Sequence, residues 1–140
     1  MVALAMELLD ETLGEVADYS KITFSAPVGP SNRQYANGAL LLRSRLNPLS
    51  LLNVMQDTET MLGRVRRGQR WQARTLDLDI VLWSGGIFAH PALSIPHPMF
   101  RERDFVLAPA TQIAPRWRDP VTGLTVRQLA ARQAKWVRRS

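Results

Sequence analysis

The segment from Arg64 to Trp83 concentrates the residues of this chain that could do charge-based chemistry. Arginines come first, at positions 64, 66, 67, 70 and 74, and two aspartates follow, Asp77 and Asp79. Apolar residues alternate with the aspartates, as is typical of a β-strand, at Leu76, Leu78, Ile80 and Leu82. Both carboxylates therefore share one face, and the rise of a strand puts their Cα atoms roughly 6–7 Å apart.

Two carboxylates at this separation can hold hydrated Mg²⁺, which takes one or two carboxylates together with phosphate oxygens of a substrate. A cation beside them relieves the repulsion between the two like charges. The arginines then supply guanidinium groups for the other phosphate oxygens. An isolated Asp-x-Asp is more often a solvated strand edge, and such an edge beside a basic loop is the alternative here. The arginines and the apolar strand make this alternative less favoured here than for an arbitrary Asp-x-Asp, and both interpretations stay open at this point.

Residues 70–80 form a long motif that reads Arg-Trp-x-x-Arg-Thr-Leu-Asp-Leu-Asp-Ile. Shorter motifs lie on either side of it: Tyr35-x-Asn37, Gly63-Arg64-Val65-Arg66, Ile95-Pro96-His97-Pro98 and Arg103-x-Phe105. Together they resemble the motifs of the 6-hydroxymethyl-7,8-dihydropterin pyrophosphokinases, and the resemblance covers most of residues 1–135. Two positions depart from the family pattern, since Ala92 stands where relatives often have a basic residue and Pro98 where an aromatic residue is frequent.

The resemblance implies an enzyme of folate biosynthesis that transfers pyrophosphate from ATP to 6-hydroxymethyl-7,8-dihydropterin, giving AMP and the pterin diphosphate. It implies two Mg²⁺ ions bound with ATP, with Asp77 and Asp79 as the metal ligands. The catalytic residues that it implies are Arg64, Arg74, Asp77 and Asp79. A loop carrying Arg66, Arg67 and Arg70 would close over the ATP phosphates.

The resemblance also implies two groups of binding residues. For ATP they are Gln56, Glu59, Arg66, Arg70, Trp71, Arg74, Ile80, Ser94, His97 and Arg103. For the pterin they are Ser25, Ala26, Pro27, Val28, Tyr35, Asn37, Trp71 and Phe105, with the pterin stacked between Trp71 and Phe105.

The same residues have simpler explanations when each is taken alone. Asn37 could cap a turn, and His97, between two prolines, could be a loop residue satisfied by the backbone. Trp71 and Phe105 could belong to the core, and Gln56 and Glu59 could be solvated on a helix face.

Composition bounds the class of protein. The chain has 140 residues, of which 46% are hydrophobic, and this is enough for one globular domain with a real core. It has no cysteine, which is compatible with a reducing cytoplasm, and no apolar run long enough to span a membrane, so no membrane partner is expected. A cytoplasmic location is what the resemblance implies. A formal charge of +6 favours an anionic partner. The C-terminal residues 132–140 form a basic tail, which we expect to be solvated.

The expected elements alternate between helices and strands. Helices are predicted over residues 2–13, 47–62, 101–113 and 125–133, and strands over 17–26, 36–42 and 76–83. Asn47 and Thr125 have the character of helix caps, Gly63 of a helix stop, and Ser84 to Gly86 of a turn, whereas residues 84–98 have little regular structure. This order predicts an α+β fold with helices on one face of an antiparallel sheet, which resembles the family's ferredoxin-like core.

The family fold begins with a strand and a Gly-Ser-Asn turn, whereas this chain starts inside what reads as the first helix. The single domain 1–140 is therefore expected to be N-terminally truncated relative to the family. Residues 39–42 and 80–83 are apolar on both faces, like interior strands, which need neighbours on both sides. We accordingly expect this chain to be poorly stable or to associate, although a full-length family member would be a monomer.

Two other functions are compatible with the sequence. One is an inactive truncated relative of the pyrophosphokinases. The other is a non-catalytic module that binds a nucleotide or nucleic acid, because a basic loop beside Trp71 also suits phosphate and base contacts. The enzyme with two small-molecule substrates and no nucleic-acid partner is the favoured prediction.

Overall fold

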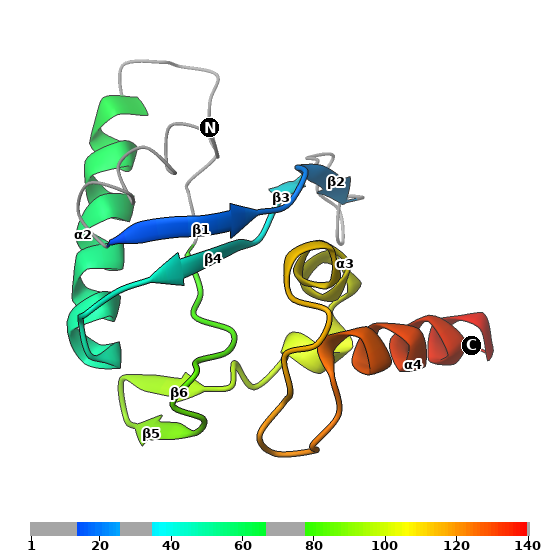
Figure 1. Ribbon diagram of the computed structural model, residues 1–140. Helices are drawn as coiled ribbons and strands as arrows, with labels where there is room; N and C mark the ends of the chain where they lie inside the picture. Colours follow the sequence, from blue (N-terminus) through cyan, green and yellow to red (C-terminus); the bar gives the residue numbers. More distant parts are fainter. Residues whose placement is uncertain (1–13, 26–34, 67–77, 140) are drawn as a thin grey trace.

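The computed structural model describes residues 14–25, 35–66 and 78–139, and the predicted helix 2–13 lies outside these ranges. Figure 1 shows helices beside small antiparallel sheets, which confirms the α+β class. Within the described ranges the strands pair in twos, as β1 with β4, β2 with β3 and β5 with β6. No helix in these ranges is long and apolar enough to cross a membrane.

The first four strands form one interrupted antiparallel ribbon (Figure 1). β1 (Glu15–Tyr19) pairs with β4 (Leu40–Arg43), and β2 (Thr23–Ser25) pairs with β3 (Tyr35–Asn37). Between the two pairs, the buried Ser20 donates its N–H to the Ala39 carbonyl and accepts the Ala39 N–H on its Oγ, both at 2.8 Å. The predicted strands 17–26 and 36–42 are therefore present, but each is broken where the Ser20 side chain replaces a backbone partner.

Helix α2 (Pro48–Arg66) starts as predicted. The Asn47 side chain accepts the Ser50 N–H at 2.9 Å, which caps the helix, and Pro48 takes the first helical position. The predicted end at Gly63 is wrong, because the helix continues to Arg66. A glycine costs a helix only about 1 kcal/mol relative to alanine, and arginines in the last turn favour the negative end of the helix dipole. Arg64 and Arg66 consequently lie on α2 and not in the basic loop.

Two apolar clusters make up the core of the described residues. In the first, Met55 of α2 is 7% exposed and packs against Leu40, Leu42, Leu51, Val54, Leu78 and Ile80. In the second, the buried residues are Phe100, Leu107 and Leu129, and their partly buried neighbours are Val81, Leu82, Val106, Leu124 and Ala130. Residues 78–82 thus contribute to both clusters.

The predicted strand 76–83 is not confirmed in its described part, since residues 78–83 pair with no strand. The Leu78 N–H is bound instead by the Glu59 Oε1 at 2.9 Å, and the Val81 carbonyl accepts the His97 N–H at 3.0 Å. Two backbone groups that would bond a neighbouring strand thus bond the Glu59 side chain and the backbone of the loop at His97. The predicted alternation still holds at Leu78 and Ile80, which both face Met55.

The chain after residue 83 is more regular than predicted. The turn at residues 84–86 is confirmed by the Gly86 N–H, which donates to the Trp83 carbonyl at 3.0 Å, and Gly86 takes a φ of 95° that suits glycine. A hairpin follows, formed by β5 (Phe88–His90) and β6 (Leu93–Ile95). The prediction missed it because three-residue strands that flank a proline give little periodic signal.

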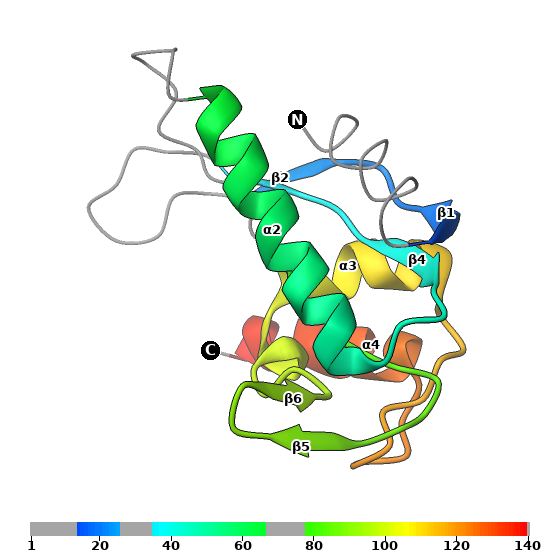
Figure 2. The same cartoon turned by 90° about the vertical axis from the view of Figure 1, so that its left-hand side faces the viewer.

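The C-terminal part consists of the short 3₁₀ helix η1 (Phe100–Glu102), α3 (Asp104–Ile113) and α4 (Val126–Arg139). Thr125 caps α4 as predicted, since its Oγ1 accepts the Gln128 N–H at 3.1 Å while its own N–H donates to the Gln128 Oε1 at 2.9 Å. The predicted end at residue 133 is wrong. The tail contains no glycine or proline before Arg139, so the helix takes up most of it (Figure 2).

An ion pair between the partly buried Arg101 and the buried Asp119 joins η1 to the loop between α3 and α4. Asp119 is 0% exposed, and Arg101 donates to its carboxylate from Nε at 2.5 Å and from Nη2 at 2.8 Å. The Thr122 hydroxyl and the Val121 N–H donate to the same carboxylate at 2.7 and 3.0 Å. These hydrogen bonds, led by the one from Arg101, hold the pKa of Asp119 well below its ordinary value.

This shift makes stability depend on pH in acid. An unfolded Asp119 binds a proton near pH 3.9, whereas the folded one stays ionised, so its contribution is complete at neutral pH and is lost as pH falls below about 4. We expect Asp119→Asn to lower the free energy of unfolding by about 3 kcal/mol at pH 7, because Arg101 loses its partner. The pH dependence between about 4 and 2 should flatten as well.

Urea unfolding of the parent and of Asp119→Asn across this pH range tests the expectation. The matched control is Asp18→Asn, which changes an exposed carboxylate of β1. Equal slopes of stability against pH in the parent and in Asp119→Asn would contradict it.

Candidate functional site

Asp79 lies at the surface of the segment that joins the two apolar clusters. Its neighbours Leu78 and Ile80 face Met55, so the alternation turns Asp79 outward, and its side chain is 58% exposed. Glu59 of α2 fixes the start of this segment through its bond to the Leu78 N–H. The carboxylate of Asp79 is therefore presented to solvent from a backbone that is held on both sides.

His97 faces Asp79 from the turn after β6. The His97 Nε2 lies 3.9 Å from the Asp79 Oδ1, which is too long for a direct hydrogen bond. The backbone holds the ring, because the Met99 N–H donates to the His97 Nδ1 at 3.2 Å. In the neutral ring this bond puts the proton on Nε2, the nitrogen nearer Asp79. His97 is thus satisfied by the backbone at one nitrogen and presents a donor at the other.

Other predicted ATP-binding residues come from neighbouring elements. Gln56 is exposed on α2 three positions before Glu59, and α2 contacts β6, which carries the exposed Ser94. Ile80 packs in the Met55 cluster. Contacts thus join Glu59 to Leu78, the neighbour of Asp79, and join Asp79 to His97. Gln56 lies on the same helix as Glu59, and Ser94 lies on β6, which precedes His97.

The described pterin-binding residues lie on β2, on β3 and in the first turn of α3. Asn37 ends β3 and is partly buried, Phe105 lies in the first turn of α3, and α3 contacts β2, β3 and β4. Ser25 and Tyr35 pair across the β2–β3 ladder. The Arg103 guanidinium lies 5.7 Å from the centre of the Phe105 ring, so Arg103 links the predicted nucleotide residues to the predicted pterin residues.

Several predicted residues fall outside the described ranges and remain predictions. These are Ala26, Pro27, Val28, Arg67, Arg70, Trp71, Arg74 and Asp77, together with the side chains of Ser25, Tyr35, Arg64 and Arg66. The described residues nevertheless fix both ends of the segment 67–77. The segment follows Arg66, the last residue of α2, and it precedes Leu78, whose N–H binds Glu59. Glu59 lies two helical turns before Arg66, so the two ends of the segment are held about 10 Å apart along the axis of α2.

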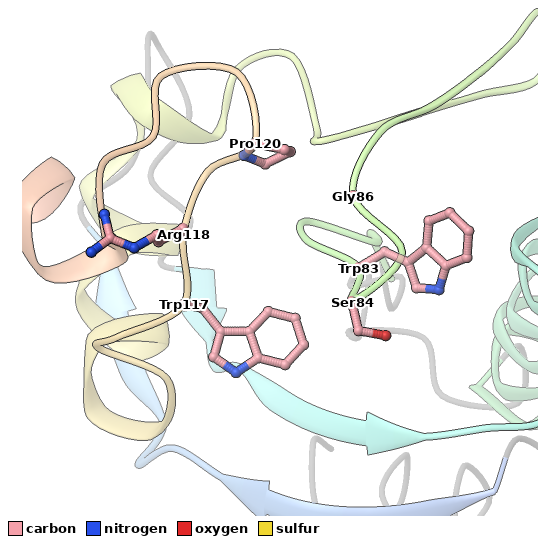
Figure 3. A pocket seen from close by; sticks show the side chains of 6 residues that line it. All are labelled: Trp83, Ser84, Gly86, Trp117, Arg118 and Pro120. Carbon is pink, nitrogen blue, oxygen red and sulfur yellow. The ribbon is translucent and has the colours of Figure 1, made fainter.

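A pocket of about 330 Å³ lies apart from these residues. Figure 3 shows it between the turn at Trp83, Ser84 and Gly86 and the loop at Trp117, Arg118 and Pro120. Arg118 points away from the pocket and donates to the Gly123 carbonyl at 2.7 Å. None of the predicted site residues lines this pocket, so we do not assign ATP or the pterin to it.

Sequence reasoning also missed the pair of Arg101 and Asp119. The segment Asp119-Pro120-Val121-Thr122-Gly123 carries a turn signature, because Asp, Pro and Gly each favour turns. This signal could have located the loop. No periodic pattern could have paired its aspartate with an arginine on a different element.

Comparison with known proteins gives a consistent result. The model of the family described as 7,8-dihydro-6-hydroxymethylpterin-pyrophosphokinase matches residues 1–115. Three relatives bear the name 2-amino-4-hydroxy-6-hydroxymethyldihydropteridine pyrophosphokinase. The one from Synechocystis sp. is 41% identical over 75% of this chain and 53% of its own length, and the one from Pseudomonas aeruginosa is 40% identical over 83% and 70%. The one from Methylorubrum extorquens is 36% identical over 94% and 83%.

The match thus spans about half of the Synechocystis relative and more of the other two. The family model covers well over half of this chain, and it includes the segment that carries Asp79 and His97. The chain belongs to the 7,8-dihydro-6-hydroxymethylpterin-pyrophosphokinase family.

Proposed function

We propose that this chain transfers pyrophosphate from ATP to 6-hydroxymethyl-7,8-dihydropterin, releasing AMP and the pterin diphosphate in folate biosynthesis. The names of its relatives support this reaction. The observation that carries it is the exposed Asp79 carboxylate facing the donor nitrogen of His97, on a backbone that Glu59 holds. A chain without cysteine that uses ATP also fits the reducing cytoplasm.

The donor chemistry of Asp79 fits Mg²⁺. The side chain is more than half exposed, and among the described residues the chargeable group within 4 Å of it is His97. A carboxylate free to accept a hydrated cation is the ligand that Mg²⁺ prefers, and Asp77 would be the second one. Mg²⁺ bound with ATP would neutralise phosphate charge and so favour attack at phosphorus.

The residues of the chain do the remaining work by binding and orienting. His97 would donate from Nε2 to a phosphate oxygen, while Arg64, Arg66, Arg70 and Arg74 would neutralise charge on the phosphates. Attack by the pterin hydroxymethyl oxygen forms a bond to the β-phosphorus, breaks the bond to the α–β bridging oxygen and releases the hydroxyl proton. Positioning and charge neutralisation are the main requirements of such a transfer.

The pterin would be held on the side of α3 that contacts β2 and β3. The Phe105 ring offers a flat surface for stacking, and Arg103 lies near that ring. The Asn37 amide can both donate and accept hydrogen bonds to the edge of a heterocycle. Arg103 would thus lie between the nucleotide and the pterin.

The proposed metal site predicts the effect of replacing Asp79. Asp79→Ala should slow pterin-dependent AMP release in Mg²⁺ by about 100-fold or more, because an oxygen ligand for the cation is lost, while pterin binding changes little. The control is Asp57→Ala, which removes an exposed carboxylate of α2 away from Asp79 and should keep parental activity. Parental turnover in Asp79→Ala would contradict the metal assignment.

The same assay tests the reaction itself. Pterin-dependent AMP release by the parent supports the enzyme. A chain that binds ATP without releasing AMP would be an inactive relative, and one that binds only single-stranded oligonucleotide would be a binding module. Either result would refute the proposed reaction.

A further prediction concerns the segment 64–74. Its arginines carry like charges that repel one another in an empty site, so ATP should bring them into a closed arrangement. Amide hydrogen exchange with and without a non-hydrolysable ATP analogue and Mg²⁺ measures this. We expect slower exchange with the analogue over residues 64–74 and no change in α4, which serves as the internal control. Equal exchange over residues 64–74 in both states would rule out closure.

A further inference from the structure

We propose that the pair of Arg101 and Asp119 is the positioning device of the nucleotide side of the site, because it holds residues 97–103 in the turn that orients His97 and Arg103. This inference rests on the proposed function, since it assumes that His97 and Arg103 contact ATP. Neither Arg101 nor Asp119 was among the residues that the sequence motifs implied.

The backbone of this turn is held by long hydrogen bonds. The Phe100 N–H donates to the His97 carbonyl at 3.3 Å, the Glu102 N–H to Met99 at 3.2 Å and the Arg103 N–H to Phe100 at 3.3 Å. These distances lie at or beyond the upper end of the usual range, and 3₁₀ geometry is poor for hydrogen bonding. The turn therefore needs restraints from outside its own backbone.

Two single bonds hold the turn near its ends, from the His97 N–H to the Val81 carbonyl at 3.0 Å and from the Gln133 Nε2 to the Glu102 carbonyl at 3.1 Å. Two further restraints act at its centre. Phe100 is 1% exposed and packs with Leu107 and Leu129. Arg101, next to it, makes the two short bonds to Asp119 and lies 4.8 Å from the centre of the Phe100 ring. Apolar packing fixes how deeply Phe100 enters the core, but it is not directional. The paired bonds of the Arg101 guanidinium are directional, so they fix how the turn is rotated relative to the core.

Asp119 can act as an anchor because its own loop is rigidly bonded. Its N–H donates to the Leu124 carbonyl, and its carbonyl accepts the Gly123 N–H, both at 2.8 Å. The Val126 N–H at the start of α4 donates to the Trp117 carbonyl, also at 2.8 Å. The loop is thus closed on itself and fastened to α4, which packs on Phe100 through Leu129.

The chemistry of Arg101 also assigns it a positioning role and not a direct contact with phosphate. Its Nε and Nη2 both donate to the fully buried Asp119 carboxylate, which balances its charge. Arg103 has no such carboxylate among the contacts of the described residues and stays available to an anion. The two arginines of one short segment therefore have different tasks.

The test compares Arg101→Lys and Asp119→Asn with Thr122→Val. Lysine keeps the charge but cannot form the paired bonds, and asparagine keeps the shape but not the charge. Thr122→Val removes the hydroxyl bonds to Asp119 and to the Leu124 N–H and leaves Arg101 and its partner in place, so it controls for general loosening of the loop. All variants are assayed well below their unfolding temperatures.

We expect Arg101→Lys and Asp119→Asn to raise the ATP KM and Kd by about tenfold, with kcat and pterin affinity within about threefold of the parent. Amide exchange over residues 97–103 should also become faster. Thr122→Val should leave ATP affinity and this exchange unchanged. A purely structural role would lower the unfolding temperature of the folded variants without this selective loss for ATP.

The proposal would be overturned if folded Arg101→Lys showed both unchanged ATP affinity and unchanged exchange over residues 97–103. If Asp119→Asn does not fold, the result for Arg101→Lys alone tests the proposal. Failure of the proposed function looks different, since the parent itself would then release no AMP. In that case exchange over residues 97–103 alone decides whether the pair holds the turn. Faster exchange in Arg101→Lys but not in Thr122→Val supports it, and equal exchange in both refutes it.

Discussion

Residues 78–82 are packed on both sides, and this constraint decides where the charged groups of the site face. Leu78 and Ile80 enter the cluster around Met55, whereas Val81 and Leu82 enter the cluster around Phe100. Rotating the segment would bury the Asp79 carboxylate and expose apolar side chains, and both changes are costly. The exposed position of Asp79 is thus a consequence of the apolar core and does not need a specific contact of its own.

The sequence predicted those features that arise within a few residues of one another. The caps at Asn47 and Thr125 were readable because a cap needs only a side chain and an amide two or three positions later. The outward direction of Asp79 was readable because its apolar neighbours alternate. For the same reason the turn at residues 84–86 was found, since glycine permits the positive φ that the turn requires.

Features that depend on distant residues could not be read in this way. A strand prediction over 76–83 assumes a hydrogen-bonded neighbour, and residues 78–83 have in its place a glutamate from α2 and the amide of His97. The end of α2 was missed because a glycine costs a helix little, and both α2 and α4 carry arginines in the last turn, where they favour the helix dipole. For the candidate site, the motifs named side chains whose roles stay predictions, and they named neither Arg101 nor Asp119. Nothing in the local sequence of Arg101 indicates that its guanidinium pairs with a carboxylate eighteen positions later.

The charge of the chain sets a further condition on the site. A net charge of +6 draws anionic ligands to the whole surface, but it cannot place a triphosphate at one position. Placement needs charges held in a fixed geometry, and in the proposed site two acidic groups would provide it. The Glu59 carboxylate holds the backbone amide of Leu78, next to Asp79 in the chain. The buried Asp119 carboxylate holds the guanidinium of Arg101, which lies between His97 and Arg103 in the sequence. Each uses an acidic group that holds another part of the chain, a backbone amide in one case and a guanidinium in the other.

A buried ion pair is an inefficient way to stabilise a fold. The Asp119 side chain is fully removed from water and the Arg101 side chain mostly so, at 26% exposed. Such removal costs several kcal/mol for a fully buried ion, and well-packed apolar residues of similar volume often serve stability equally well. The pair of Arg101 and Asp119 gives what apolar residues cannot, because two parallel bonds define a direction. Phe100 already anchors this turn in the apolar core. A second apolar residue beside it would bury more surface but would not fix how the turn is rotated relative to the core. The need for a fixed rotation is greatest where a short turn carries a donor at each end, and residues 97–103 are such a turn, with His97 at one end and Arg103 at the other.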